Sequence, residues 1–268
     1  MTTLRNKLAE ARAQGRAALI GYLPAGFPDV ESSIRVVRAM VEGGCDVIEV
    51  GLPYSDPMMD GPTIQRAADT ALAAGTTTDD VFRVVEATAA TGAAAVVMSY
   101  WNPIERYGVE RFAGSLAKAG GCGVITPDLI PEEAQEWVAA SETAGLDRIF
   151  LVAPSSTDRR LELTTRACSG FVYAASLMGV TGTRAQVADT AEELVRRTRE
   201  ATRESELPIC VGLGISTGAQ AAEVASYADG VIAGAGFCQR ILDAPDLEAG
   251  LVAVTSFAEE LAAGVRSR

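Results

Sequence analysis

The sequence of 268 residues predicts an α/β protein, a (β/α)8 TIM barrel in a single domain (1–268) with an extra helix at its N-terminus. Three observations predict this fold. Short runs of branched apolar residues recur at intervals of roughly 20–35 residues, and each is followed by a segment of helical periodicity. No linker or charge block interrupts the alternation. Eight such units in a chain of this length favour a closed barrel over an open doubly wound sheet.

The strands are expected where apolar runs end at a glycine- or proline-rich loop. Pro24 ends the first run, and Asn102–Pro103 end the third, because proline lacks the N–H that a sheet requires. The expected strands are 18–24, 46–53, 93–103, 123–129, 148–154, 170–176, 208–214 and 229–236.

The helices are expected from amphipathic periodicity and from capping residues. Ser32 or Ser33 is expected to cap the helix that ends near Glu42. The expected helices are 4–16, 32–42, 63–74, 79–90, 109–119, 131–144, 158–167, 190–203, 217–226 and 247–265.

Composition limits the possible functions. The net charge of −12 argues against nucleic acid and anionic membranes as partners, because both require clustered Lys and Arg. The N-terminus has no apolar signal region and no segment reaches the length of a membrane span, so a cytoplasmic location is expected. The five cysteines form no C-x-x-C pair and are interpreted as single buried thiols, without disulfide or zinc.

Two residue types that often carry catalysis are scarce. The chain contains no histidine, and its only lysines are Lys7 and Lys118, both on expected helices. Histidine triads and histidine-ligated metals are therefore excluded, and a lysine imine is disfavoured. Carboxylates remain as the available acid and base.

Glu49 interrupts the apolar strand 46–53, where an ionised carboxylate is costly unless it is paired or solvated. Strand geometry places Val47, Glu49 and Gly51 on one face, which we expect to point into the barrel. The alternative is a structural carboxylate paired with an arginine of a neighbouring strand. Only Arg148 lies within another expected strand, at its wrong end. Glu49 is therefore expected to have a raised pKa and to act as a general acid.

The loop after this strand carries Asp56 and Asp60. Asp60 precedes Gly61–Pro62 at the start of a helix, where an Asp is most often a cap or turn residue, so its local sequence leaves a catalytic role open. Asp56, in the motif S-D-P, is interpreted as a turn residue or a contact to a partner.

Three glycine clusters follow the last three strands, at G-V-T-G (179–182), V-G-L-G-I-S (211–216) and A-G-A-G (233–236). Barrels often bind phosphate between these loops and a helix N-terminus, through backbone N–H groups. Such a site needs no basic side chain and suits an acidic chain. Six aromatic or apolar residues also point at the rim of the barrel: Tyr22, Met98, Tyr100, Trp101, Phe171 and Tyr173. By default they belong to the core, and the alternative is that a few of them line an aromatic pocket.

These features predict a substrate with a phosphate and an aromatic group. A carbon–carbon bond is usually cleaved with the help of a lysine imine or a metal ion. Without either, the carbon that leaves must belong to a group that becomes electron-accepting when it is protonated. An indole ring protonated at C3 is such a group.

The chain resembles the tryptophan synthase α subunit family over nearly its whole length. The most specific motifs are I-E-V-G-L-P-Y-S-D-P-M-M-D-G-P-T-I-Q, Y-A-A-S-L-M-G-V-T-G-T-R and V-G-L-G-I-S. The resemblance implies retro-aldol cleavage of indole-3-glycerol phosphate to indole and D-glyceraldehyde 3-phosphate. It also implies an α2β2 complex in which indole passes to a β subunit. No cofactor is expected in this chain, and pyridoxal phosphate is expected in the partner.

The resemblance also implies roles for individual residues. Glu49 resembles the acid that protonates indole C3, and Asp60 the carboxylate that stabilises positive charge at the indole nitrogen. Asp56 resembles part of the surface that faces the β subunit. The remaining matches orient Asp60 (Tyr173, Thr181) or bind phosphate (Gly182, Gly214, Gly234, Ala235). Of the residues at the rim, Tyr22, Met98 and Tyr100 are the candidates for an indole pocket.

One position departs from the family pattern. Where the family usually has G-S-A, this chain has Gly234–Ala235–Gly236, so the backbone N–H of residue 235 is kept and a hydroxyl contact is lost. Weaker phosphate binding with intact chemistry is expected. Three readings remain beside the α subunit: a mainly non-catalytic activating subunit, a free-standing or specialised-pathway lyase, and another phosphate-binding barrel enzyme such as an isomerase.

Overall fold

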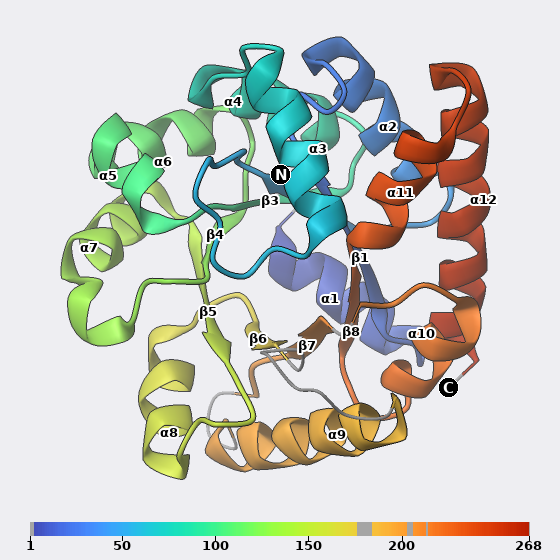
Figure 1. The fold of residues 1–268 in the computed structure, drawn as a ribbon. Coiled ribbons are helices and arrows are strands. Elements are labelled where there is room, and N and C mark those ends of the chain that lie inside the picture. The colour runs from blue at the N-terminus through green and yellow to red at the C-terminus, as the bar shows by residue number, and fades with distance from the viewer. Residues whose placement is uncertain (1–2, 176–183, 203–205, 213, 268) are drawn as a thin grey trace.

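The computed structural model describes residues 3–175, 184–202, 206–212 and 214–267. Within them, eight parallel strands pair in sequence order and close into a barrel, and β8 returns to β1 (Figure 1). This confirms the predicted (β/α)8 fold. The strands are β1 (Ala18–Pro24), β2 (Val47–Gly51), β3 (Ala94–Met98), β4 (Gly123–Thr126), β5 (Asp147–Val152), β6 (Val172–Ala175), β7 (Ile209–Gly212) and β8 (Gly230–Ala233).

Helices surround the barrel, and Figure 1 looks onto the face where the strands end, called here the upper face. The helices are α1 (Leu4–Ala13), α2 (Val30–Glu42), α3 (Pro62–Ala73), α4 (Thr78–Ala89), α5 (Trp101–Tyr107), α6 (Val109–Lys118), η1 (Pro131–Glu133), α7 (Gln135–Ala144), α8 (Asp158–Ala167), α9 (Arg184–Ala201), α10 (Gly218–Ala225), α11 (Ala235–Asp243) and α12 (Leu247–Arg266).

Alternation along each strand divides the apolar residues between two layers. On β2, Val47 belongs to the cluster inside the barrel, whereas Ile48 and Val50 belong to the cluster between strands and helices. Leu4 and Leu8 of α1 join the inner cluster, so the extra N-terminal helix closes the lower end of the barrel (Figure 1). Glu49 shares the inward face with Val47, as predicted.

The lower face is held by polar contacts at strand starts. Arg16 donates to both carboxylate oxygens of Asp46, at 2.6 and 2.8 Å, and Asp46 also accepts from the N–H of Leu19 at 2.9 Å. Arg148 donates to Ala167 and Ser141 on this side. Its side chain therefore lies at the opposite end of the barrel from the strand ends.

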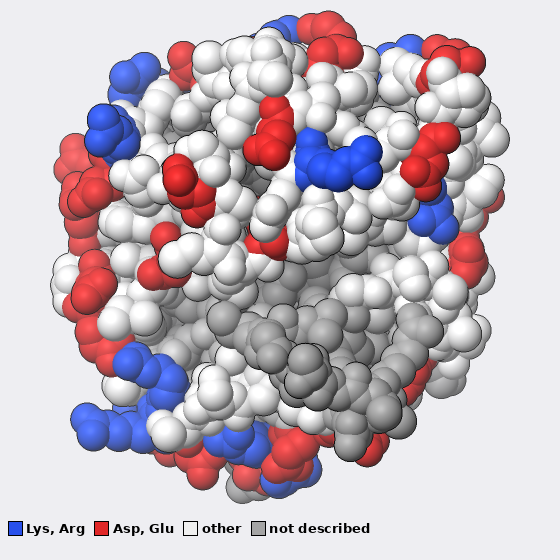
Figure 2. Space-filling view, in the orientation of Figure 1, with Lys and Arg blue, Asp and Glu red and all other residues white. Residues whose placement is uncertain are grey.

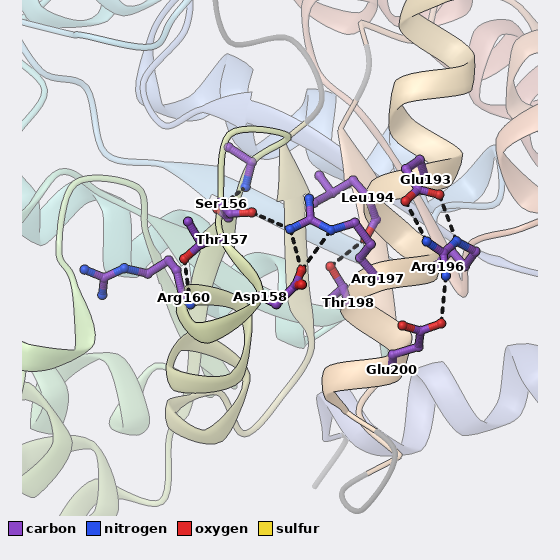
Figure 3. Close-up of polar contacts among 11 residues, drawn as sticks. Ser156, Thr157, Asp158, Arg160, Glu193, Leu194, Arg196, Arg197, Thr198 and Glu200 are labelled. Carbon is purple, nitrogen blue, oxygen red and sulfur yellow. Dashed lines mark hydrogen bonds and ion pairs between the residues drawn. The ribbon is translucent and has the colours of Figure 1, made fainter.

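Polar contacts also fix α9, the helix that begins at Arg184. Arg197 reaches across to the start of α8, where its guanidinium donates to the Ser156 carbonyl and to Asp158, each at 2.7 Å (Figure 3). Arg196 pairs instead with Glu193 and Glu200 on the exposed side of α9 (Figure 3). The Arg197 contacts join α9 to the β5–α8 connection on the outside of the barrel.

The structure contains two helices that the sequence did not predict, and α9 begins at Arg184, before the expected start at 190. Residues 101–107 and 235–243 form α5 and α11, where the sequence predicted a strand end and a glycine loop. The cap of α2 is Asp29, whose carboxylate accepts from the N–H of Ser32 at 2.9 Å, and not Ser32 or Ser33. None of the five cysteines, all within the described residues, forms a disulfide, and all are buried except the half-buried Cys122.

Candidate active site

Glu49 lies in the middle of β2, in register with Tyr22 of β1 and Val96 of β3. Its side chain is 1% exposed, and its Oε2 atom is buried without a hydrogen-bond partner among the described residues. A structural carboxylate in this position would be paired with an arginine or bonded by several donors. The structural alternative for Glu49 therefore finds no support in the described part of the chain.

Burial raises the pKa of Glu49 from its ordinary value of 4.5 to about 8, and the negative charge of Asp60 contributes in the same direction. A carboxyl group with this pKa is mostly protonated at neutral pH. Removing the proton leaves a charge that the apolar interior does not solvate. Glu49 is thus suited to give a proton to a substrate and to take one back.

Asp60 stands in the loop between β2 and α3, two residues before the helix begins. The cap of α3 is Gly61, and no side chain caps this helix. The Asp60 carboxylate is therefore not used as a helix cap, although its backbone carbonyl accepts from Gln65 at 2.8 Å. Partial burial raises the pKa of Asp60, and a hydrogen bond with the Tyr100 hydroxyl acts in the opposite direction.

Tyr22 is buried beside both carboxylates. Its ring fills the space between the ends of β2 and β8, since a Cβ at Gly51 would come within 2.5 Å of its hydroxyl oxygen and one at Gly234 within 3.0 Å of its Cδ1. Burial, Asp60 and Glu49 each raise its pKa. Gly51 was not singled out from the sequence. The sequence feature that could have indicated Gly51 is its position two residues after Glu49, which places it on the same inward face of the strand.

Tyr173 of β6 faces Glu49 from the opposite wall. Burial raises its pKa, and the charges of Glu49 and Asp60 add to this effect, which places the phenol near both carboxylates. Its hydroxyl lies over Gly212 of β7, where a Cβ would collide with it. Its ring contacts Phe171 at a centroid distance of 6.4 Å. Glycine at 212 therefore makes room for an aromatic side chain.

The ends of β7 and β8 form a corner of backbone. Gly214 has a φ of +63°, a conformation that glycine adopts readily. Gly234 caps α11, Ala235 is its first residue, and no side chain caps the helix. An uncapped helix N-terminus presents N–H groups and positive partial charge to an anion.

The other predicted residues are distributed as follows. Met98 ends β3 and is half-buried against the inner cluster, and Tyr100 is 5% exposed at the start of α5. Asp56 is exposed on the β2–α3 loop and accepts from the Ser55 hydroxyl. Thr181 and Gly182 lie outside the described residues.

Asp128 was not predicted from the sequence, and its carboxylate accepts from the N–H of Trp101 at 2.9 Å.

The upper face is hollowed near its centre, and no Lys or Arg of the described residues lies in the hollow (Figure 2). No group of three or more metal-ligating side chains occurs within the ranges that the structure describes. In the same ranges, no helix combines the length and apolar character needed to cross a membrane.

The fold is that of a (β/α)8-barrel enzyme, and this pair of carboxylates near the strand ends suits acid–base chemistry. A model of the tryptophan synthase alpha chain family matches residues 8–266. The chain belongs to this family, and it is a lyase of tryptophan biosynthesis that acts on indole-3-glycerol phosphate.

Individual relatives agree with this assignment. The tryptophan synthase alpha chain of Thermobifida fusca is 74% identical over 267 residues, covering 100% of this chain and 99% of the relative. That of Acidothermus cellulolyticus is 59% identical, covering 99% and 98%. A crystal structure of tryptophan synthase from M. tuberculosis in an open form has a chain that is 52% identical, with a TM-score of 0.90 and 99% of each chain covered.

Proposed function

We propose that this chain is the alpha subunit of a tryptophan synthase, and that Glu49 and Asp60 carry out the cleavage of indole-3-glycerol phosphate. The observation that carries the proposal is the buried Glu49 carboxyl group, whose pKa near 8 keeps it protonated at neutral pH beside a second carboxylate. A protonated acid with no other hydrogen-bond partner at Oε2 is available to a substrate.

The first step transfers the Glu49 proton to C3 of the indole ring. This forms the new C3–H bond and leaves a positive charge that is shared with the ring nitrogen. The carboxylate of Asp60, on the loop over the same pocket, stabilises that charge. Because both groups are partly or fully removed from water, their interaction with the cation is stronger than it would be in bulk solvent.

The second step breaks the bond between C3 and the glycerol chain. A base removes the proton of the hydroxyl group on the adjoining carbon, that carbon becomes the aldehyde of glyceraldehyde 3-phosphate, and the bonding electrons return to the ring. Glu49, now a carboxylate, is placed to accept this proton. The chain therefore ends the cycle in its starting protonation state.

The remaining site residues hold the substrate. Backbone groups of Gly214, Gly234 and Ala235, with Gly182, would hold the phosphate at the α11 N-terminus. Tyr22, Met98 and Tyr100 would line the indole pocket, and Tyr173 with Thr181 would orient Asp60. The support is that burial and the charge of Asp60 both raise the pKa of Tyr22, Tyr100 and Tyr173, which places the three phenols near that carboxylate.

A β subunit is the proposed partner, in an α2β2 complex where indole passes to a pyridoxal-phosphate site of that subunit. The exposed Asp56 and Met58 on the β2–α3 loop support a contact surface on the upper face. We further propose a cytoplasmic location and one domain over 1–268. The full-length match to a family member supports the single domain, and membership of a family of biosynthetic enzymes supports the location.

Indole release from indole-3-glycerol phosphate tests the carboxylate roles. Glu49→Gln and Asp60→Asn are expected to lower turnover by about 100-fold or more, since positioned acid–base groups contribute on this scale. Asp69→Asn, an exposed carboxylate of α3, is the matched control. Near-normal turnover in either site variant would contradict the mechanism. Assays with and without a β subunit separate a catalytic from a mainly activating subunit.

A further inference from the structure

The hydroxyl group of Tyr100 holds the loop between β2 and α3. Its oxygen accepts from the N–H of Met58 at 3.1 Å and from the N–H of Met59 at 2.9 Å. These two residues directly precede Asp60. Tyr100 itself is 5% exposed and follows β3, so its position is fixed by the barrel wall.

The proton of the Tyr100 hydroxyl is directed to the side chain of Asp60. A phenolic oxygen accepts two hydrogen bonds and donates one. The amides of Met58 and Met59 occupy both acceptor positions, which leaves the hydroxyl proton to donate. Burial raises the pKa of Asp60, and a hydrogen bond with the Tyr100 hydroxyl opposes part of that rise. One hydroxyl group therefore fixes the backbone before Asp60 and favours its charged form.

The loop gains little support from its own side chains. Met58 is 75% exposed, and Ser55 and Asp56 are exposed as well. Tyr54 is the exception, because its ring packs on that of Tyr100 at 5.3 Å. The loop therefore depends on contacts to the start of α5 and not on an apolar core.

The start of α5 is fixed in turn by its neighbours. Asn102 donates to the Tyr54 hydroxyl at 3.2 Å, and the N–H of Trp101 donates to both oxygens of Asp128, at 2.9 and 3.1 Å. Asp128 follows β4. The connections after β2, β3 and β4 thus form one hydrogen-bonded group around Tyr100.

We infer that Tyr100 is a positioning residue, which sets the place of Asp60, and with it the surroundings of the Asp60 carboxylate, through its bonds to the two preceding amides. This inference rests on the role proposed for Asp60. The titratable groups that face Asp60 come from several elements: Glu49 of β2, Tyr22 of β1, Tyr173 of β6 and Cys238 of α11.

The test is Tyr100→Phe in the full chain, which keeps the ring and removes the hydroxyl. We expect kcat for indole release to fall by about tenfold or more, because the loss of a few hydrogen bonds corresponds to this change in rate. The acid limb of the pH profile of kcat should move to higher pH, since Asp60 loses a bond that favours its ionised form. Hydrogen exchange at the Met58 and Met59 amides should become faster.

Tyr107→Phe is the matched control, because it removes a phenol bonded to Asp79 on the outer side of the barrel. It should leave kcat and the pH profile unchanged. An unaltered acid limb or unaltered amide exchange in Tyr100→Phe would overturn the inference. If Asp60→Asn also kept normal turnover, the proposed function itself would fail, so the two failures are distinguishable.

Discussion

The charge of Asp60 and the burial of Glu49 act together on one proton. Glu49 is enclosed by β1, β2 and β3, and Asp60 on the following loop adds repulsion to the loss of solvation, so the pKa of Glu49 rises to about 8. At neutral pH, Glu49 is therefore mostly protonated, and the Asp60 carboxylate lies close enough to influence its pKa. Such a pair separates an acid from a charge stabiliser.

The raised pKa makes stability depend on pH. A carboxyl group whose folded pKa of about 8 exceeds its ordinary value of 4.5 holds a proton in the folded state where the unfolded chain has lost it. Folding therefore loses stability as pH rises from 4.5 through 8. The full effect corresponds to roughly 5 kcal/mol.

Glu49→Gln should remove this dependence. The variant should be more stable than wild type at pH 8.5 by a few kcal/mol, and the difference should vanish near pH 4.5. Urea unfolding of both proteins between pH 5 and 8.5 measures it. Equal slopes of stability against pH would show that Glu49 is already ionised at neutral pH.

Asp60→Asn should lower the pKa of Glu49 without restoring its ordinary value. The substitution removes the charge of Asp60, but desolvation, the larger cause, remains. Titration of 13C-labelled glutamate carboxyl groups by NMR measures the shift, with Asp69→Asn as the control. A Glu49 pKa that does not change would mean that burial alone sets it.

Ala235→Ser should lower KM for indole-3-glycerol phosphate and leave kcat unchanged. A hydroxyl at the first residue of α11 adds a hydrogen bond to a charged group, worth about 1.5–3 kcal/mol, so the decrease should be about tenfold or more. Ala244→Ser, at the other end of the same helix, is the control. An unchanged KM would show that the phosphate does not reach this position, or that water already supplies the bond.

The barrel could be predicted because its signals repeat. Each strand needs an apolar run and each loop needs glycine or proline, and eight repetitions average out local errors. The inward direction of Glu49 followed from the two-residue period of a strand. Both predictions depend on backbone geometry that adjacent residues determine.

The two missed helices show where local sequence is ambiguous. Proline fits the first turn of a helix as well as a strand end, so Asn102–Pro103 started α5 where a stop was expected. At α11, Gly234 and Gly236 indicated a loop, whereas the structure has a helix whose Phe237 packs against Phe257 of α12. The bonds from Met58 and Met59 to Tyr100 were likewise hidden, because they join residues far apart in sequence.

Arg16 and Asp46 join the first two strands at the lower face. Arg16 is 9% exposed and forms two hydrogen bonds to Asp46, which also accepts from Leu19. Removing Arg16 leaves the Asp46 carboxylate, which is 14% exposed, without its ion-pair partner, so Arg16→Ala should lower the free energy of unfolding by about 3 kcal/mol.

Two variants make this prediction specific. Arg196→Ala, which breaks the exposed pairs to Glu193 and Glu200 on α9, should change stability little, because solvent screens such pairs. Arg16→Met combined with Asp46→Leu should recover part of the stability, since no charge is then buried alone. Urea unfolding at pH 7 measures all three. If Arg16→Ala matched Arg196→Ala, the Arg16–Asp46 pair would not hold the first two strands together.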